Sequence, residues 1–224
     1  MNAQPVTLDD KYRQPEGEIY LSGMQALVRL LLEQARSDRT RGHTTGGFVS
    51  GYRGSPIGGL DRELWRAKAL LEEHNVRFVP GLNEELAATA CWGTQQVPLF
   101  PQPQVQGVFS LWYAKNPGVD RAMDAIKHGS HAGTSALGGV LVAAGDDHLA
   151  KSSAFGHQSE YEFVDCLMPV LAPENIAEII QLGLAGWALS RYCGSWVGLK
   201  LAGSICEGSA TIDLAPPRDW PTPA

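Results

Sequence analysis

The stretch Gly138-Gly139-Val140-Leu141-Val142-Ala143-Ala144 decides the fold class of this chain. Its apolar run is continuous, whereas a strand with one wet face would alternate apolar and polar side chains. A continuous apolar strand is typical of a parallel sheet that is covered by helices on both faces. The run opens into Gly145-Asp146-Asp147-His148, so a polar connection follows this strand directly.

Segments on either side of this strand alternate between strand and helix patterns. Ser22 and Gln25 have the spacing of a capping box at the start of the first helix, while Gly183 and Gly186 argue against one unbroken helix up to Tyr192. The alternation predicts an α/β fold with a doubly wound, mostly parallel sheet and right-handed crossovers. We expect strands at residues 46–52, 76–79, 107–113, 168–171, 196–201 and 210–214, and helices at residues 21–35, 60–73, 84–96, 120–128 and from 173 onward.

A second informative stretch is Asn83-Glu84-Glu85-Leu86-Ala87-Ala88, which begins a helix just after the strand at residues 76–79. Asn83 is a favourable N-cap, and glutamates suit the positive end of a helix. In an open α/β sheet, ligands bind where such helix starts meet the carboxyl ends of the strands. Acidic residues in a first turn more often only offset the helix dipole, so local physics leaves both interpretations of Glu84 open.

Two other connections follow strands in the same way. The turn Arg53-Gly54-Ser55-Pro56-Ile57-Gly58-Gly59 has the glycine content of a phosphate cradle but lacks the order of a Rossmann or P-loop motif. Lys115 follows the strand at residues 107–113 and could meet a carboxylate or a phosphate, although a loop lysine is more often only solvated. Parallel strands would place Ser55, Glu84, Lys115 and Asp147 at one edge of the sheet. Their common position follows from the predicted topology and is not separate evidence for a site.

The composition excludes several classes of protein. With 224 residues, 44% hydrophobic and 19% charged, the chain has an ordinary globular composition, and its net charge of −6 argues against a nucleic-acid partner. It has no signal-peptide pattern and no apolar stretch of the ~18 residues needed to cross a membrane, so we expect a cytoplasmic protein. The four cysteines are scattered along the sequence, which favours free thiols and gives this chain no ligand set for an iron–sulfur cluster. They are Cys91, Cys166, Cys193 and Cys206.

The domain organisation follows from where the periodicity begins and ends. Residues 1–18 have no periodicity and are predicted to be an N-terminal arm. Residues 19–214 are predicted to form one domain. Residues 215–224 are rich in proline and are predicted to be a tail or a linker.

The pattern Asn83-Glu84-x-x-Ala87-Ala88 after a strand resembles the pyrimidine-binding (PYR) domain of thiamine diphosphate enzymes, in which the glutamate hydrogen-bonds a ring nitrogen of the aminopyrimidine. Further segments resemble the 2-oxoacid:ferredoxin oxidoreductases, most closely the indolepyruvate ferredoxin oxidoreductase family. The likeness runs from about Ile19 to about Leu214. It is carried by residues 51–56 (GYRGSP), 115–121 (KNPGVDR), 145–147 (GDD) with Ser152 and Ser153, and 186–192 (GWALSRY).

The resemblance assigns roles to individual residues. It implies that Glu84 is catalytic and binds the cofactor, together with Asn83 and Gly54. It implies that the 2-oxoacid is bound by Ser55, Lys115, Asp147 and Ser153. Ser55 stands at the threonine position of a Tyr-Pro-x-Thr-Pro motif, in which Arg53 here replaces the first proline. The loop with Asp146, Asp147, Ser152, Ser153, Gln158 and Glu160 is interpreted as an active-site or interface loop, or equally as a polar surface loop.

The magnesium-binding motif of these enzymes begins Gly-Asp-Gly, and this chain departs from it at Asp147, so no metal ligand is predicted. The resemblance implies a thiamine diphosphate-dependent oxidoreductase that converts an aryl pyruvate to an acyl-CoA. Magnesium, the iron–sulfur clusters and the diphosphate-binding (PP) domain are expected elsewhere, in the same longer chain or in another subunit. Ferredoxin, coenzyme A and the 2-oxoacid are the other implied partners, and we expect a homo-oligomer.

Two alternatives stay open at this point. The chain could be a catalytically silent assembly domain that keeps the PYR fold, because Arg53 changes the substrate turn. It could also be the PYR domain of another thiamine enzyme, such as a decarboxylase, although residues 52–56 and the loop with Asp147 and Ser153 favour the oxidoreductases. The sequence does not identify the 2-oxoacid.

Overall fold

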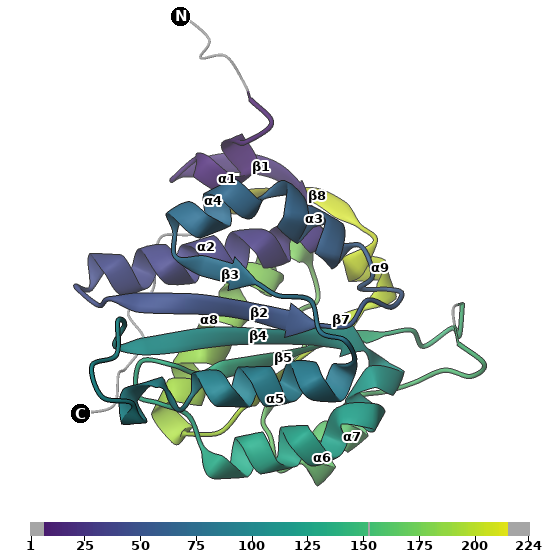
Figure 1. The fold of residues 1–224 in the computed structure, drawn as a ribbon. Coiled ribbons are helices and arrows are strands. Elements are labelled where there is room, and N and C mark those ends of the chain that lie inside the picture. Colours follow the sequence, from purple (N-terminus) through teal and green to yellow (C-terminus); the bar gives the residue numbers. More distant parts are fainter. Residues whose placement is uncertain (1–6, 152, 215–224) are drawn as a thin grey trace, which may run out of the picture.

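The computed structural model describes residues 7–151 and 153–214 and has a six-stranded parallel sheet at its centre (Figure 1). The spatial order of the strands is β3-β2-β4-β5-β7-β6. All seven residues of β5 are buried, as the continuous apolar run predicts. The strands are β2 (Thr45–Gly51), β3 (Val76–Phe78), β4 (Gly107–Lys115), β5 (Val140–Asp146), β6 (Val170–Leu171) and β7 (Val197–Ala202).

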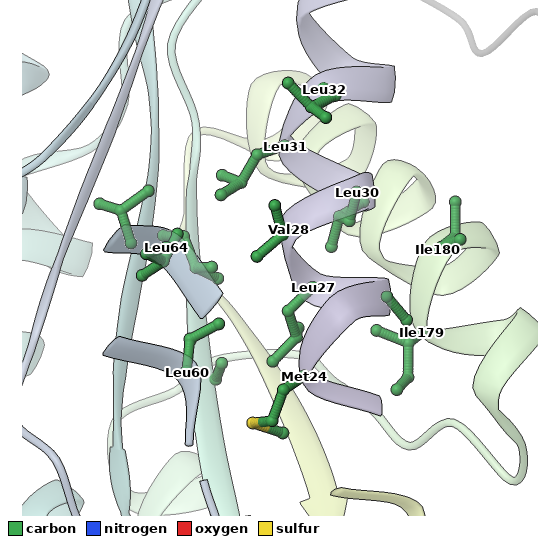
Figure 2. Close-up of a cluster of buried hydrophobic side chains, with 14 of the residues drawn as sticks. Met24, Leu27, Val28, Leu30, Leu31, Leu32, Leu60, Leu64, Ile179 and Ile180 are labelled. Atoms are coloured by element: carbon green, nitrogen blue, oxygen red, sulfur yellow. The ribbon is translucent and has the colours of Figure 1, made fainter. Parts of the chain in front are cut away.

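Helices cover both faces of this sheet, which confirms the predicted doubly wound α/β fold (Figure 1). One face packs against α2 (Gly23–Thr40), α3 (Leu60–Arg66), α4 (Lys68–Glu73) and α8 (Ile176–Cys193). The other face packs against α5 (Glu84–Thr94), α6 (Asn116–Ala132) and α7 (Glu160–Asp165). Figure 2 shows the first of these two cores, where Leu27 and Leu31 of α2 lie between Leu64 of α3 and Ile179 of α8.

The first long helix begins where its capping residues predict. The Ser22 side chain accepts a hydrogen bond from the Gln25 main-chain N–H over 3.3 Å, and the Gln25 side chain accepts one from the Ser22 N–H over 3.0 Å. The helix therefore starts at Gly23, two residues later than the apolar pattern alone suggests. Leu21 belongs to the preceding strand, and its fully buried side chain joins the same core.

The helix expected from residue 173 onward is α8, which runs unbroken from Ile176 to Cys193, although Gly183 and Gly186 weighed against an unbroken helix. Gly183 and Gly186 serve close packing instead. A Cβ atom on Gly183 would lie 2.2 Å from a methyl carbon of Leu30, and one on Gly186 would lie 2.6 Å from a methyl carbon of Leu141. The glycines therefore let α8 approach both α2 and the sheet closely.

The N-terminal region is more structured than an arm. From residue 7 onward it contains α1 (Asp10–Arg13) and then β1 (Gly17–Ser22), which pairs with β8 (Ser209–Leu214) in a separate antiparallel sheet. The buried guanidinium of Arg29 on α2 holds this region by donating to the main-chain oxygen of Gln14 over 2.6 Å. Residues 1–6 and the predicted tail at 215–224 lie outside the described residues.

Two short elements complete the chain. A 3-10 helix, η1 (Val97–Leu99), lies in the proline-rich connection before β4, and α9 (Gly203–Cys206) follows β7. Within residues 7–151 and 153–214, no helix combines the length and the apolar character needed to cross a membrane.

Candidate active site at the carboxyl edge of the sheet

The adjacent strands β2 and β4 form a topological switch point. The connection after β2 leads to α3 on one face of the sheet, whereas the connection after β4 leads to α6 on the opposite face. Loops that leave neighbouring strands toward opposite faces leave room for a ligand between them. A ligand site is therefore expected beyond the carboxyl ends of these two strands.

Glu84 lies at this edge as the first residue of α5. The Asn83 side chain caps the helix by accepting a hydrogen bond from the Leu86 N–H over 2.8 Å. Only 6% of Glu84 is exposed, so its carboxyl group is more than a surface charge that offsets the helix dipole. In addition, the indole N–H of Trp112 on β4 donates to the main-chain oxygen of Glu84 over 2.9 Å, which fixes the helix start on the sheet.

The side chain of Glu84 lies against the first turn of α6. A Cβ atom on Gly118 would lie 2.7 Å from Cγ of Glu84 and 3.0 Å from its Oε1, so only glycine leaves room for the glutamate there. On the outer side, Nε of Arg121 lies 3.8 Å from Oε2 of Glu84, and the Arg121 side chain is 73% exposed. A carboxyl group held in this way can accept a hydrogen bond from a heterocyclic ligand that covers it, or donate one to it when protonated.

The glycine-rich turn folds over the ends of β4 and β5. The side chain of Lys115 packs on Gly54, where a Cβ atom would lie 2.8 Å from the Cγ and Cδ atoms of the lysine. The buried Ile57 packs on Gly145 of β5 in the same way, with its Cβ 3.0 Å from the position of an added Cβ. The structure thus brings Gly54 and the exposed Ser55 beside Lys115, at the switch point.

Asp147 and Ser153 follow β5 in a different setting. Asp147 comes directly after the strand, and Ser153 belongs to the connection between β5 and α7, whose described residues project beyond the sheet (Figure 1). The neighbouring Ser152 lies outside the described residues. The assignment of Asp147 and Ser153 to the same site as Glu84 stays a prediction.

A network of acidic groups at the base of this loop was only partly predicted. Asp146 is fully buried and accepts hydrogen bonds from the Ser159 N–H over 3.0 Å and from the Ser159 hydroxyl over 3.1 Å. Lys200 of β7 forms an ion pair with Glu160, and its Nζ lies 3.8 Å from Oδ2 of Asp146. Burial raises the pKa of Asp146 from its ordinary value. No local pattern in the sequence points to Lys200.

The same network continues to the first residue of α6. Nδ2 of Asn116 donates to Oε2 of Glu162 over 2.9 Å. Burial raises the pKa of Glu162 to about 7, and the negative charges of Asp120 and Asp146 act in the same direction. This pair was not predicted, because no helix was expected at residues 160–165 and Asn116 appeared only within the motif at residues 115–121.

A pocket of about 550 Å³ lies at the far end of α6 from Glu84, between the last turns of α6, α7 and α8. Its wall includes Lys127, His131 and the exposed Cys193. The other three cysteines are buried. In the described parts of the chain, no three His, Cys, Asp or Glu side chains are placed to bind one metal ion.

Comparisons with known proteins support the fold. No family model and no curated protein sequence matches the chain. Among solved structures, it is similar to a 2-oxoglutarate:ferredoxin oxidoreductase from Magnetococcus marinus that was solved with 2-oxoglutarate, coenzyme A and succinyl-CoA bound. The TM-score is 0.67 at 17% sequence identity over 89% of this chain, which spans only 32% of the length of that protein. The fold of this chain is therefore that of one part of a 2-oxoacid:ferredoxin oxidoreductase.

Proposed function

We propose that this chain is the pyrimidine-binding portion of a thiamine diphosphate-dependent 2-oxoacid:ferredoxin oxidoreductase of the indolepyruvate type. The observation that carries the proposal is the position of Glu84. Its carboxyl group is buried at a helix start, beside a switch point of a parallel sheet, in a space that Gly118 keeps open. The similarity in fold to part of a 2-oxoacid:ferredoxin oxidoreductase supports the same class of enzyme.

The residues present fit the pyrimidine half of thiamine diphosphate. A carboxyl group can hydrogen-bond a ring nitrogen, and Asn83 and Trp112 fix the helix turn that carries it. The bound cofactor supplies the electron sink for decarboxylation, which no protein side chain provides. The task of Glu84 is then to hold the pyrimidine and to keep a proton at its ring nitrogen, a form of acid–base help typically worth ~10² to 10⁴ in rate.

The substrate would lie over the glycine-rich turn. The ammonium group of Lys115 is suited to pair with the carboxylate of a 2-oxoacid, and the exposed hydroxyl of Ser55 lies in the turn beside it. The loop after β5 would contribute Asp147 and Ser153. An aryl pyruvate is proposed as the substrate because the sequence motifs resemble the indolepyruvate family.

A second domain must complete this site, and the surface around Glu84 suits such a partner. Four apolar side chains that follow β2, or lie between β3 and the first turn of α5, are at least 40% exposed, and exposed apolar surface commonly marks a contact. We propose that a diphosphate-binding (PP) domain covers them and brings magnesium, and that iron–sulfur clusters, ferredoxin and coenzyme A act elsewhere in a homo-oligomeric enzyme. The four residues are Tyr52, Val79, Leu82 and Leu86.

The native product that carries this sequence provides the test. It should be purified without cleavage, and its intact mass, its thiamine diphosphate content and its aryl-pyruvate-dependent reduction of a low-potential dye should be measured. We expect a product heavier than 24.1 kDa, or a complex with a second subunit, that contains thiamine diphosphate and reduces the dye. A native assembly that neither contains nor binds thiamine diphosphate would overturn the proposal.

One observation favours a second candidate, an assembly domain without catalytic function. The glycine-rich turn carries the exposed, bulky Arg53 at a position where the resembling motif has proline. A silent domain would still pack against its partner through the surface around Leu82 and Leu86. In that case, replacement of Glu84 by glutamine would leave the turnover of the assembled enzyme unchanged.

A further inference from the structure

The first residue of α6 has an unusual hydrogen-bonding pattern. Asn116 is 1% exposed, and its amide nitrogen donates to Oε2 of Glu162 over 2.9 Å. Its amide oxygen is buried and lacks a hydrogen-bond partner among the residues that the structure describes. A buried acceptor without a donor is unfavourable, so the observed orientation of the amide satisfies only its nitrogen side.

The surroundings of Glu162 disfavour its negative charge. The carboxylates of Asp120, Asp146 and Glu160, on three different elements, place negative charge around it. Lys200 forms ion pairs with two of them, Asp146 and Glu160. When Glu162 is charged, it needs the donor that Asn116 offers. Of these groups, Asp120 belongs to α6, Asp146 to β5, Glu160 to α7 and Lys200 to β7. In addition, Nε2 of His148 lies 3.9 Å from Oδ2 of Asp146, and a Lys127–Asp165 ion pair joins α6 to the end of α7.

We propose that Asn116 and Glu162 form a proton-linked switch, in which the side-chain amide of Asn116 turns over when Glu162 takes up a proton. In the charged state, N–H of Asn116 donates to the carboxylate, which is the orientation of the amide in the structure. When Glu162 takes a proton from solvent, its O–H becomes a donor and the amide oxygen of Asn116 becomes its acceptor. The amide nitrogen then faces the opposite side.

The turnover changes the first turn of α6 beside the candidate site. Asn116 directly follows Lys115, and Gly118 of the same turn contacts Glu84. At a pH above the transition, the side of the Asn116 amide that faces away from Glu162 presents the oxygen, which is an acceptor. At a pH below the transition, that side presents the nitrogen, which is a donor. This proposal concerns only Asn116 and Glu162, and it does not depend on the proposed function.

The chain contains a matched internal control. Nδ2 of Asn175 also donates to a glutamate, Oε1 of Glu178, over 3.0 Å. Its amide oxygen, however, already accepts a hydrogen bond from the Glu178 N–H over 3.0 Å as the N-cap of α8. The amide of Asn175 is therefore fixed through both of its ends, whereas the amide oxygen of Asn116 has no such hydrogen bond among the residues that the structure describes.

Nuclear magnetic resonance on the intact chain tests the switch. The side-chain amide signals of Asn116 and Asn175 and the carboxyl carbon of Glu162 should be followed between about pH 5 and about pH 9. We expect the Asn116 signals and the Glu162 carbon to change together, with a midpoint of about 7, while the Asn175 signals show no transition at that midpoint. In Glu162→Gln the Asn116 transition should disappear.

Two results would overturn the proposal. Asn116 signals that stay constant while the Glu162 carbon titrates would show an amide held in one orientation. An Asn116 transition that persists in Glu162→Gln would show that another group causes it. Both readouts come from the folded wild-type chain or from one neutral substitution, so neither requires catalytic activity.

Discussion

Trp112 donates a hydrogen bond from its indole nitrogen to the main-chain oxygen of Glu84 over 2.9 Å, and both residues are buried. The bond joins the middle of β4 to the first residue of α5. It holds the helix start in register with the sheet, so the position of the Glu84 carboxyl group depends on a residue 28 positions further along the chain.

Replacement of this donor tests its contribution. Trp112→Phe keeps an aromatic ring in the core but removes the N–H, and we expect a loss of about 1–3 kcal/mol in the free energy of unfolding. Trp65→Phe is the control, because Trp65 is half exposed, and we expect a change within about 0.5 kcal/mol there. Denaturant unfolding measures both, and equal losses in the two variants would contradict the role of the Trp112 bond.

Gly118 keeps the space in which Glu84 lies. Gly118→Ala places a methyl group 2.7 Å from Cγ of Glu84 and 2.7 Å from Cβ of Ala114, and we expect a loss of about 1–3 kcal/mol in stability. Gly93→Ala in α5 is the control, since nothing lies within 4 Å of an added Cβ, and a gain of up to about 1 kcal/mol is expected. A Gly118→Ala protein as stable as wild type would contradict the close contact.

A buried ion pair joins α8 to α2 at the amino edge of the sheet. Arg191 of α8 donates from Nη1 and Nη2 to the two carboxylate oxygens of Asp38 on α2, over 2.7 and 2.8 Å. Arg191→Ala leaves the Asp38 charge buried without its main partner, and we expect a loss of about 3–5 kcal/mol in the free energy of unfolding.

The exposed pair of Arg13 and Glu73 provides the comparison, with a distance of 3.2 Å and 54% exposure of each side chain. We expect Arg13→Ala to cost at most about 1 kcal/mol, because solvent screens this pair. Denaturant unfolding of the two variants should therefore differ clearly. A loss for Arg191→Ala as small as that for Arg13→Ala would mean that the buried pair contributes no more than a surface contact.

The raised pKa of Glu162 predicts a pH dependence of stability. The folded chain keeps the proton of Glu162 up to about pH 7, whereas an unfolded glutamate loses it at about pH 4.3. The folded state therefore binds more protons in this interval, and the stability that Glu162 contributes is lost as the pH rises through it. Relative to wild type, Glu162→Gln should become more stable between about pH 5 and about pH 8.

Denaturant unfolding at both ends of this range measures the difference. The exposed residue Glu85 supplies the control variant, Glu85→Gln, for which no such gain is expected. If the difference in the free energy of unfolding between Glu162→Gln and wild type is the same at both pH values, the raised pKa of Glu162 is contradicted.

The sequence predicted those features that depend on neighbours in the chain. The apolar run before Gly145 revealed the central strand, and the residues Ser22 and Asn83 marked helix starts that the structure confirms. Parallel topology also predicted that the Ser55 turn and Lys115 would meet at one edge. These patterns have short periods, so they are visible without knowledge of tertiary contacts.

The features that were missed join distant positions. Asn116 and Glu162 are 46 residues apart, Glu160 and Lys200 are 40 residues apart, and Asp38 and Arg191 are 153 residues apart. No local pattern predicts which polar and charged side chains of distant elements will meet. Gly183 was misleading for the same reason, because the residue that requires a glycine there is Leu30 on another helix.

Two adjacent glutamates in the complete enzyme separate a role in cofactor binding from a role in helix stability. Glu84→Gln and Glu85→Gln should be made in the native product, and thiamine diphosphate-dependent turnover and unfolding should be measured for both. We expect Glu84→Gln to fold normally and to lose turnover by about 10²-fold or more, while the exposed Glu85→Gln stays close to wild type. Unchanged turnover in a folded Glu84→Gln enzyme would show that Glu84 does not serve the cofactor.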